Sequence, residues 1–212
     1  MSRAVVRQAA SLLLGYPDLD WPRRLHTVRT ALEPVPGTGI RLLERFCEQV
    51  GDTDPLALAA RYVATFDRSR RRCLYLTYYT DGDTRRRGPT LAGLKALYRE
   101  HGWRPPEDEL PDFLPLMLEF AARVPDAGTR LLAEHRAALE LLRFGLTAHR
   151  SPYADVVQAV CDTLPGTGPA TREAALRLAR TGPPAESVGL VPLPFPRLRP
   201  VPDAPHAQEA AR

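Results

Sequence analysis

The sequence lacks the motifs by which nucleotide-binding enzymes, hydrolases and zinc enzymes are commonly recognised. It contains no phosphate loop of the Gly-x-x-x-x-Gly-Lys type, no Gly-x-Gly-x-x-Gly, no Gly-x-Ser-x-Gly and no His-Glu-x-x-His. Its five histidines are scattered along the chain. We therefore predict a binding protein rather than an enzyme, with no catalytic residue and no metal site.

Cysteines and long apolar runs are also scarce. Cys47, Cys73 and Cys161 are far apart and have no metal-ligand spacing, which argues against a disulfide framework or a zinc site. The apolar run Ala9–Leu14 is too short for a signal peptide, and no stretch approaches the ~18 apolar residues of a membrane span. We expect a soluble cytoplasmic protein that does not insert into the membrane.

Charge is distributed unevenly. The net charge is +4, but the segment Arg68–Arg87 holds seven arginines and two aspartates, a balance of +5, so the other residues sum to −1. One basic segment in an otherwise balanced chain indicates a local anionic partner or local ion pairing rather than general nucleic-acid affinity. Arginines at solvated helix ends are the simpler alternative.

The apolar residues follow a helical period along most of the chain. This pattern predicts a single all-α domain over residues 1–180, a bundle of eight to ten helices, followed by an irregular, proline-rich, disordered or extended tail over 181–212, where eight prolines fall. Residues 73–79 are the one candidate for a strand. Because a lone strand leaves its backbone unpaired, we interpret them as a buried helix.

The segment 62–88 is unusual for a core helix. Tyrosines and a phenylalanine at 62, 66, 75, 78 and 79 lie close to the arginine triplets 70–72 and 85–87, with Asp67, Asp81 and Asp83 available as ion-pair partners. Arginines beside buried residues need such partners. An amphipathic peptide would fit a surface of this kind, with its apolar face on the rings and a charged rim to orient it.

The segment Glu109–Glu119 has an irregular start for a helix. Pro111 and Asp112 suit a first turn, but Pro115 removes the amide that would bond the Pro111 carbonyl. A side chain, a ligand or water must then satisfy that carbonyl. Beside the apolar stripe that follows, such a start is consistent either with the beginning of a binding groove or with a slightly bent core helix.

These segments carry a family resemblance. Leu-Leu-Gly-Tyr-Pro at 13–17, Tyr62–Asp67, Asp83–Gly88 and Glu109–Glu119 occur in an order that resembles the nitrate reductase molybdenum cofactor assembly chaperones (NarJ, the delta subunit), within the all-helical TorD/DmsD/NarJ family. The match covers roughly residues 5–165. The resemblance implies a chaperone that binds the N-terminal segment of the apo catalytic (alpha) subunit of nitrate reductase and permits molybdenum cofactor insertion before membrane attachment.

From the two segments we predict a peptide-binding groove with an apolar floor and a charged rim. Its predicted residues are Tyr62, Phe66, Asp67, Arg71, Arg72, Leu74, Tyr75, Tyr78, Asp83, Arg86, Asp112, Leu114, Met117, Leu118 and Glu119. We expect no resident cofactor, although transient contact between Arg85–Arg87 and the client's molybdenum cofactor is compatible with this role. The alternative function is an α-helical nucleic-acid-binding regulator that uses Arg68–Arg87.

Overall fold

A computed structural model describes residues 2–181, so the predicted tail lies outside the described residues except for Thr181, which ends the last helix. The described part is all-α, as predicted, with one isolated antiparallel bridge between Tyr75 and Phe113 and no strand. Its eleven helices are α1 (Ser2–Leu13), α2 (Trp21–Leu32), α3 (Thr38–Gly51), α4 (Pro55–Phe66), α5 (Tyr78–Asp81), α6 (Arg87–Glu100), α7 (Leu114–Arg123), α8 (Pro125–Glu134), α9 (Arg136–Ala148), α10 (Tyr153–Cys161) and α11 (Arg172–Thr181).

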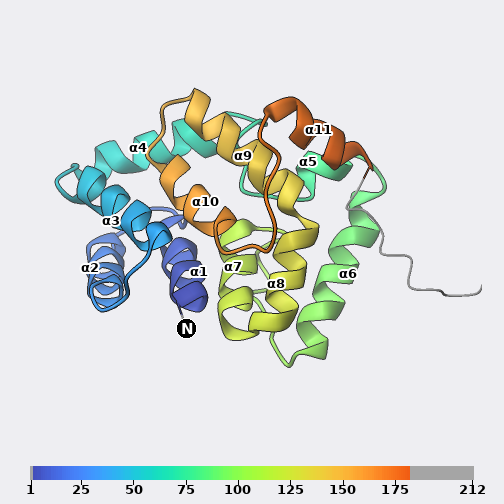
Figure 1. The fold of residues 1–212 in the computed structure, drawn as a ribbon, viewed down its shortest axis with the longest axis horizontal. Coiled ribbons are helices and arrows are strands. Elements are labelled where there is room, and N and C mark those ends of the chain that lie inside the picture. Colours follow the sequence, from blue (N-terminus) through green and yellow to red (C-terminus); the bar gives the residue numbers. More distant parts are fainter. Residues whose placement is uncertain (1, 182–212) are drawn as a thin grey trace, which may run out of the picture.

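The helices surround a centre made by α1, α7 and α10. Helix α1 packs along α7, α10 packs between α3 and α9, and α11 lies across α9. In Figure 1, α2 and α3 lie on one side of this centre, and α5, α6 and α11 lie on the other. One hydrophobic cluster runs through the whole arrangement, so the described residues share a single core.

Helix α7 is the most completely buried element. Leu114, Met117, Leu118 and Phe120 have no exposed surface. The apolar residues of this helix are not confined to one stripe, and a helix that is apolar on most sides is typical of a core. Of the two interpretations of this helix, the structure therefore supports the core helix.

Two local features show how the sequence shapes these helices. Asp54 caps α4 by accepting a hydrogen bond from the Ala57 amide, and Pro55 follows it, as the sequence predicts. The apolar residues keep a helical spacing through residues 128–148, but this stretch lies in two helices separated at His135. Helix α8 crosses α7 so closely that a Cβ on Gly128 would lie 2.2 Å from the Ala121 Cα. Glycine is needed there because only its backbone permits this approach.

Residues 73–79 do not form the buried helix that we predicted. The chain is extended near Tyr75, and α5 begins only at Tyr78. The Leu76 amide donates to the Asp112 carbonyl (3.0 Å), and the Leu114 amide donates to the Leu74 carbonyl (2.8 Å). The prediction was wrong because the segment before α7 supplies the backbone partners that we judged to be absent.

The backbone pairing between residues 74–76 and residues 112–114 also sets the start of α7. The helix begins at Leu114, so Pro115 falls in its first turn, where a missing amide is tolerated. The Pro111 carbonyl accepts a hydrogen bond from the Tyr98 hydroxyl (2.7 Å), and the Pro115 carbonyl accepts one from Ser11 (2.7 Å). Side chains of the domain, rather than a ligand, therefore satisfy the carbonyl groups at this irregular helix start.

Candidate functional site

Three adjoining hollows follow the segment 66–79 and together form what we call the groove. The aromatic hollow, about 430 Å³, is lined by Tyr16, Tyr62, Phe66, Asp67, Cys73, Leu74, Tyr75 and Phe113. The bridging hollow, about 140 Å³, is lined by Phe66, Asp67, Ser69, Arg70, Cys73, Tyr75, Tyr78 and Arg87. The basic hollow, about 400 Å³, is lined by Arg70, Arg71, Arg72, Tyr78, Tyr79, Leu141, Phe144, Gly145, Ala148, His149, Arg172 and Leu176.

The aromatic hollow has a fixed floor of rings. Tyr62 packs edge-on against Tyr16 with centroids 5.4 Å apart, and its hydroxyl donates to the Leu14 carbonyl (2.9 Å). Tyr75 and Phe113 pack at 5.4 Å. Burial raises the pKa of Tyr62 above its ordinary value, and burial together with nearby Glu109 raises that of Tyr75 to about 12. The rings therefore present a neutral apolar surface at physiological pH.

A buried ion pair holds the bridging hollow in place. The fully buried Asp112 carboxylate accepts a hydrogen bond from the Thr77 hydroxyl (2.6 Å) and lies 3.1 Å from Nη2 of Arg87. Arg87 also donates from Nε to the Thr77 hydroxyl and lies 5.9 Å from the Tyr75 ring centroid. Since a buried carboxylate requires such partners, this cluster fixes the 75–77 backbone on the segment before α7.

The basic hollow combines an apolar floor with unpaired cations. An apolar wall of this hollow is formed by Leu141 and Phe144 of α9 together with Leu176 of α11. Arg72 donates from Nε to the Thr65 carbonyl (2.9 Å), so its guanidinium is oriented by backbone. Within residues 2–181, Arg71 has no carboxylate partner, and the same holds for Arg70 and Arg172 of this hollow.

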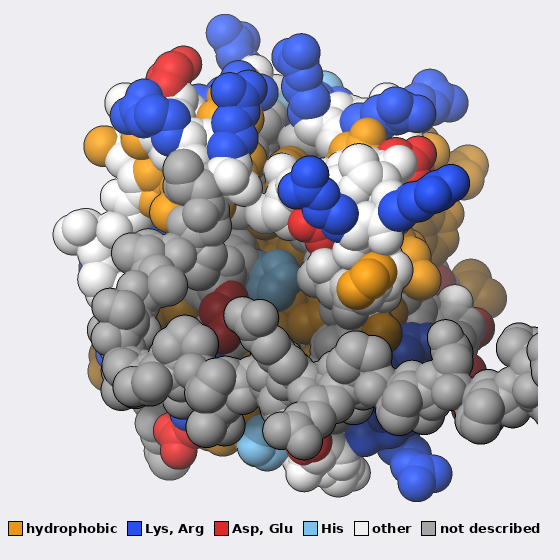
Figure 2. All heavy atoms as spheres, turned by 90° about the vertical axis from the view of Figure 1, so that its right-hand side faces the viewer, with side chains coloured by type: hydrophobic (Ala, Val, Ile, Leu, Met, Phe, Trp, Pro, Cys, Tyr) orange, Lys and Arg blue, Asp and Glu red, His pale blue; other side chains and the backbone are white. Residues whose placement is uncertain are grey.

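Basic side chains are also concentrated on the face of the molecule that carries α5, α6 and α11. Figure 2 shows Lys and Arg side chains gathered over the upper part of this face, with fewer acidic side chains among them. This agrees with the local excess of arginine in Arg68–Arg87. Positive charge is therefore distributed unevenly on the surface as well as along the sequence.

The structure brings eight of the predicted site residues to the groove and extends it in a direction that we did not expect. Five of them, Tyr62, Phe66, Asp67, Leu74 and Tyr75, line the aromatic hollow, while Arg71, Arg72 and Tyr78 line the basic one. The groove runs towards α9 and α11 rather than along α7.

The other predicted residues line none of the three hollows. Leu114, Met117 and Leu118 lie in the core because they pack against the domain's own helices, and Asp112 is the buried partner of Arg87. Glu119 accepts a hydrogen bond from Arg123 one turn on. Asp83 and Arg86 are exposed beyond the groove, around the start of α6. Leu114, Met117 and Leu118 are corrections to the predicted groove floor because they are buried in the core, and Asp112 is a correction because it is buried against Arg87. The rim roles of Asp83, Arg86 and Glu119 stay predictions.

Sequence reasoning missed several residues that line the groove. Leu141 and Phe144 lie in a helix that we expected to be an ordinary core element, and Arg172 and Leu176 lie in a helix far along the chain. No local motif marks them. Tyr16 could have been found, since it belongs to the Leu-Gly-Tyr-Pro motif that we noted, and it is 47% exposed.

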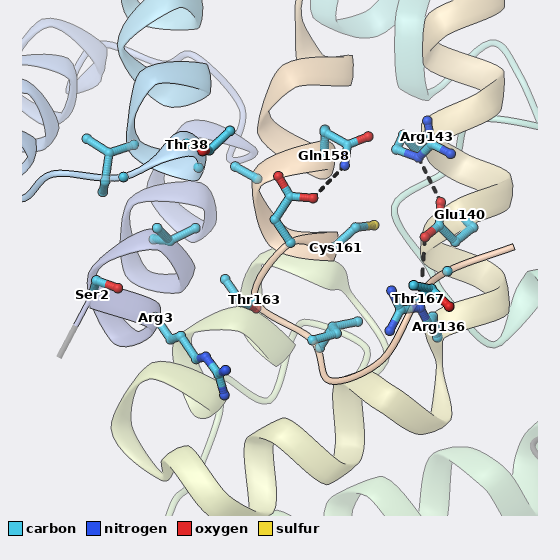
Figure 3. Close-up of a pocket in the computed structure, with 18 of the residues that line it drawn as sticks. Ser2, Arg3, Thr38, Arg136, Glu140, Arg143, Gln158, Cys161, Thr163 and Thr167 are labelled. Atoms are coloured by element: carbon cyan, nitrogen blue, oxygen red, sulfur yellow. Dashed lines mark hydrogen bonds and ion pairs between the residues drawn. The ribbon is translucent and has the colours of Figure 1, made fainter. Parts of the chain in front are cut away.

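A further cavity of about 750 Å³, larger than each of the three hollows, lies elsewhere, between α1, α9, α10 and the loop 165–169 (Figure 3). Its lining includes the buried carboxylate of Glu140, which accepts a hydrogen bond from Arg143 (2.7 Å) and lies 3.9 Å from Nε of Arg136. Arg136 also donates to the Pro165 carbonyl (2.6 Å). The buried carboxylate thus contacts both guanidinium groups beside it and offsets the positive charge of one of them. We attribute to this cluster the role of tying the loop to α9.

The fold and groove define an all-helical domain with an open surface site, and its fold is similar to that of a known structure. A redox enzyme maturation protein from Archaeoglobus fulgidus has a similar structure, with a TM-score of 0.58 over 76% of this chain and 93% of that one, at 24% identity. This likeness shows the fold alone. No helix in the described part is long and apolar enough to cross a membrane.

The chain belongs to the nitrate reductase delta subunit family, whose model matches residues 33–159. It is 34% identical to a Bacillus subtilis protein named "probable nitrate reductase molybdenum cofactor assembly chaperone NarJ", over 78% of this chain and 91% of that protein. It is 34% identical to NarJ of Escherichia coli K12, over 68% and 63%. The nitrate reductase-like protein NarX of Mycobacterium tuberculosis is 46% identical over 75% of this chain, which spans only 24% of NarX.

Proposed function

We propose that this protein is a cytoplasmic assembly chaperone for a respiratory nitrate reductase and has no catalytic activity of its own. It binds the N-terminal segment of the apo catalytic subunit. While bound, it keeps that subunit from premature membrane attachment and permits insertion of the molybdenum cofactor. The cofactor belongs to the client, and the chaperone needs no cofactor of its own.

The groove is the observation that carries this proposal. An amphipathic helix binds through an apolar face and is oriented by charges at its edge. The aromatic hollow and the α9–α11 wall offer the apolar surface, while Asp67, Arg70 and Arg71 offer the charges. Membership of the family and the names of the NarJ relatives support the choice of client.

Calorimetry with a peptide from the start of the cognate catalytic subunit tests the binding step. We expect binding with a negative heat-capacity change, because apolar surface is buried. Tyr75→Ser should weaken binding at least tenfold, since it removes an aromatic contact from the centre of the groove. Leu56→Ala is the matched control, because Leu56 is 79% exposed and lies on α4 away from the groove.

Circular dichroism should show that Tyr75→Ser remains folded at the temperature of the titration. If the peptide releases no heat and shifts no signal at micromolar concentrations and above, the groove does not bind the client's N-terminal segment. Equal affinity for Tyr75→Ser, Leu56→Ala and the native protein would place the binding surface elsewhere.

Cofactor insertion needs a separate measurement in cells that produce the reductase subunits. We expect the molybdenum content of the catalytic subunit to fall when the native chaperone is replaced by Tyr75→Ser, and to stay unchanged with Leu56→Ala. Charge reversal at Arg85 and Arg86 separates direct cofactor contact from peptide binding. If those arginines contact the cofactor, molybdenum content falls while peptide affinity is retained.

The nucleic-acid hypothesis has less support from the structure. Arg87 is engaged with Asp112, and Arg72 is engaged with the backbone of α4, so the arginines of Arg68–Arg87 do not form one free basic surface. A nucleic-acid regulator would bind duplex DNA with affinity that falls steeply as salt rises. Such a salt-dependent complex, together with no peptide binding, would favour that function over the chaperone.

A further inference from the structure

The two ends of the groove carry opposite charge. No lysine or arginine lines the aromatic hollow among the described residues, and its one charged residue is Asp67. No aspartate or glutamate of the described residues lines the basic hollow, which contains Arg70, Arg71, Arg72 and Arg172. The bridging hollow between them contains both Asp67 and Arg70, so the sign of the charge changes along the groove.

The acidic end keeps its charge because no cation in the described residues neutralises it. Asp67 is exposed and forms no ion pair there. Glu109 lies beside the same hollow, where its carboxylate accepts hydrogen bonds from the Tyr75 hydroxyl (3.2 Å) and the Leu110 amide (2.8 Å). These donors hold Glu109 in place without cancelling its charge. Arg24, the cation nearest to Tyr16, forms an ion pair with Asp18.

The basic end also keeps its charge. Arg72 is bonded to the carbonyls of Ala64 and Thr65, which orients a full positive charge at the hollow without a counterion. Arg172 comes from α11, and this helix lies beyond residues 33–159 that the family model matches. The basic end is therefore completed by a part of this chain that lies outside the family match.

We propose that the groove is directional: it binds an amphipathic helical segment with its basic end at the aromatic hollow and its acidic end at the basic hollow. This inference rests on the proposed function and adds to it the orientation of the client. The α-amino group of a client's own N-terminus is largely protonated at neutral pH. It would therefore lie near Asp67 and Glu109, and the client chain would run from there towards α9 and α11.

The expected size of this preference follows from surface electrostatics. One exposed ion pair changes an equilibrium by a factor of up to about five. Reversing a peptide replaces attraction by repulsion at both ends of the groove, so we expect a preference of about tenfold at low salt. The preference should shrink as salt rises, because the charges at the rim are exposed to solvent.

The test uses two synthetic amphipathic peptides of about five helical turns with the same apolar face and the same composition. The forward peptide has lysines in its first turn and glutamates in its last, and the reverse peptide has them exchanged. Affinities are measured for the native protein and for the charge-swapped variant Asp67→Lys/Arg71→Glu. The two free peptides differ in helix stability, because the helix dipole favours acidic residues in the first turn and basic residues in the last. This difference is the same whichever protein they bind, so it cancels when the forward-to-reverse affinity ratio is compared between the two proteins.

We expect the forward-to-reverse affinity ratio to be about tenfold or more higher on the native protein than on the charge-swapped variant. If both peptides bind and the ratio is the same on both proteins, the direction is overturned while the groove and the proposed function stand. If the ratio is higher on the variant, the direction is opposite to the one proposed. If neither peptide binds the native protein, the groove does not accept amphipathic helices, and the proposed direction is overturned. Calorimetry with the cognate N-terminal segment then decides the proposed function separately.

Discussion

The segments 62–88 and 109–119 look equally suited to a binding site in the sequence, yet the structure uses them in opposite ways. Both combine apolar residues with charged ones. The first segment leaves rings and arginines at the surface around three hollows, whereas the second buries Leu114 and Met117 completely. The difference teaches that an apolar stripe beside a proline does not distinguish a groove from a core helix. What decides is whether other helices cover the stripe.

Substitution of Leu118 should have the largest effect on stability in this comparison. Leu118→Ala leaves a cavity in the core, and we expect it to lower the free energy of unfolding by about 3 kcal/mol. Affinity of the folded variant for the client peptide should be unchanged, because Leu118 does not line the groove. Denaturant unfolding measures the first quantity and calorimetry the second. If the variant instead has native stability and weakened peptide binding, α7 forms part of the peptide-binding surface.

Arg87 and Arg71 form a matched pair of arginines: Arg87 is ion-paired with the buried Asp112, whereas Arg71 has no carboxylate partner among the described residues. Arg87→Gln leaves the buried Asp112 carboxylate without its cation. Because Arg87 is itself partly exposed, we expect a loss of about 2 kcal/mol in the free energy of unfolding, less than for Leu118→Ala. Arg71→Gln removes an exposed charge and should change stability by under about 0.5 kcal/mol. Thermal unfolding of the two variants checks this ranking. Equal losses would mean that Arg71 also has a structural role.

The last prediction concerns a reaction rate and involves no change in stability. It uses the chemical reactivity of Cys73, which lines the aromatic and bridging hollows. Burial raises the pKa of its thiol, and burial raises that of Cys47 to about 11. Because only the thiolate reacts, alkylation of Cys73 at pH 8 should be slower than that of an exposed thiol, and its rate should keep rising with pH after an exposed thiol is fully ionised. Cys47 and Cys161 are buried in the core and should not react in the native protein.

Bound peptide should slow the alkylation of Cys73 several-fold further, because it would cover the hollow that exposes the thiol. Mass spectrometry after timed quenching gives the rate for each cysteine separately, and the rate for unfolded protein is the reference. A Cys73 rate that saturating peptide does not change would show that the peptide does not lie over the aromatic and bridging hollows.

Much of the helix content could be predicted because its signals are local. The cap at Asp54 and the helical spacing of Ile40, Leu43 and Phe46 give the same result in the structure as in the sequence. Residues 73–79 could not be predicted, because their backbone is satisfied by Asp112 and Leu114, which lie more than thirty residues away. Backbone pairing between distant segments has no signature in a single short window of sequence.

The sequence by itself determined the all-α class, the resemblance to the assembly chaperones and the uneven placement of positive charge. These depend on residue identity and on the helical period, which act over a few residues. Only the tertiary structure decided that Asp112 and Arg87 form one buried cluster, that Leu114 and Met117 are sealed, and that α9 and α11 close the basic hollow. Burial and access depend on which helices lie beside one another, and that is settled by packing the whole core rather than by any local pattern.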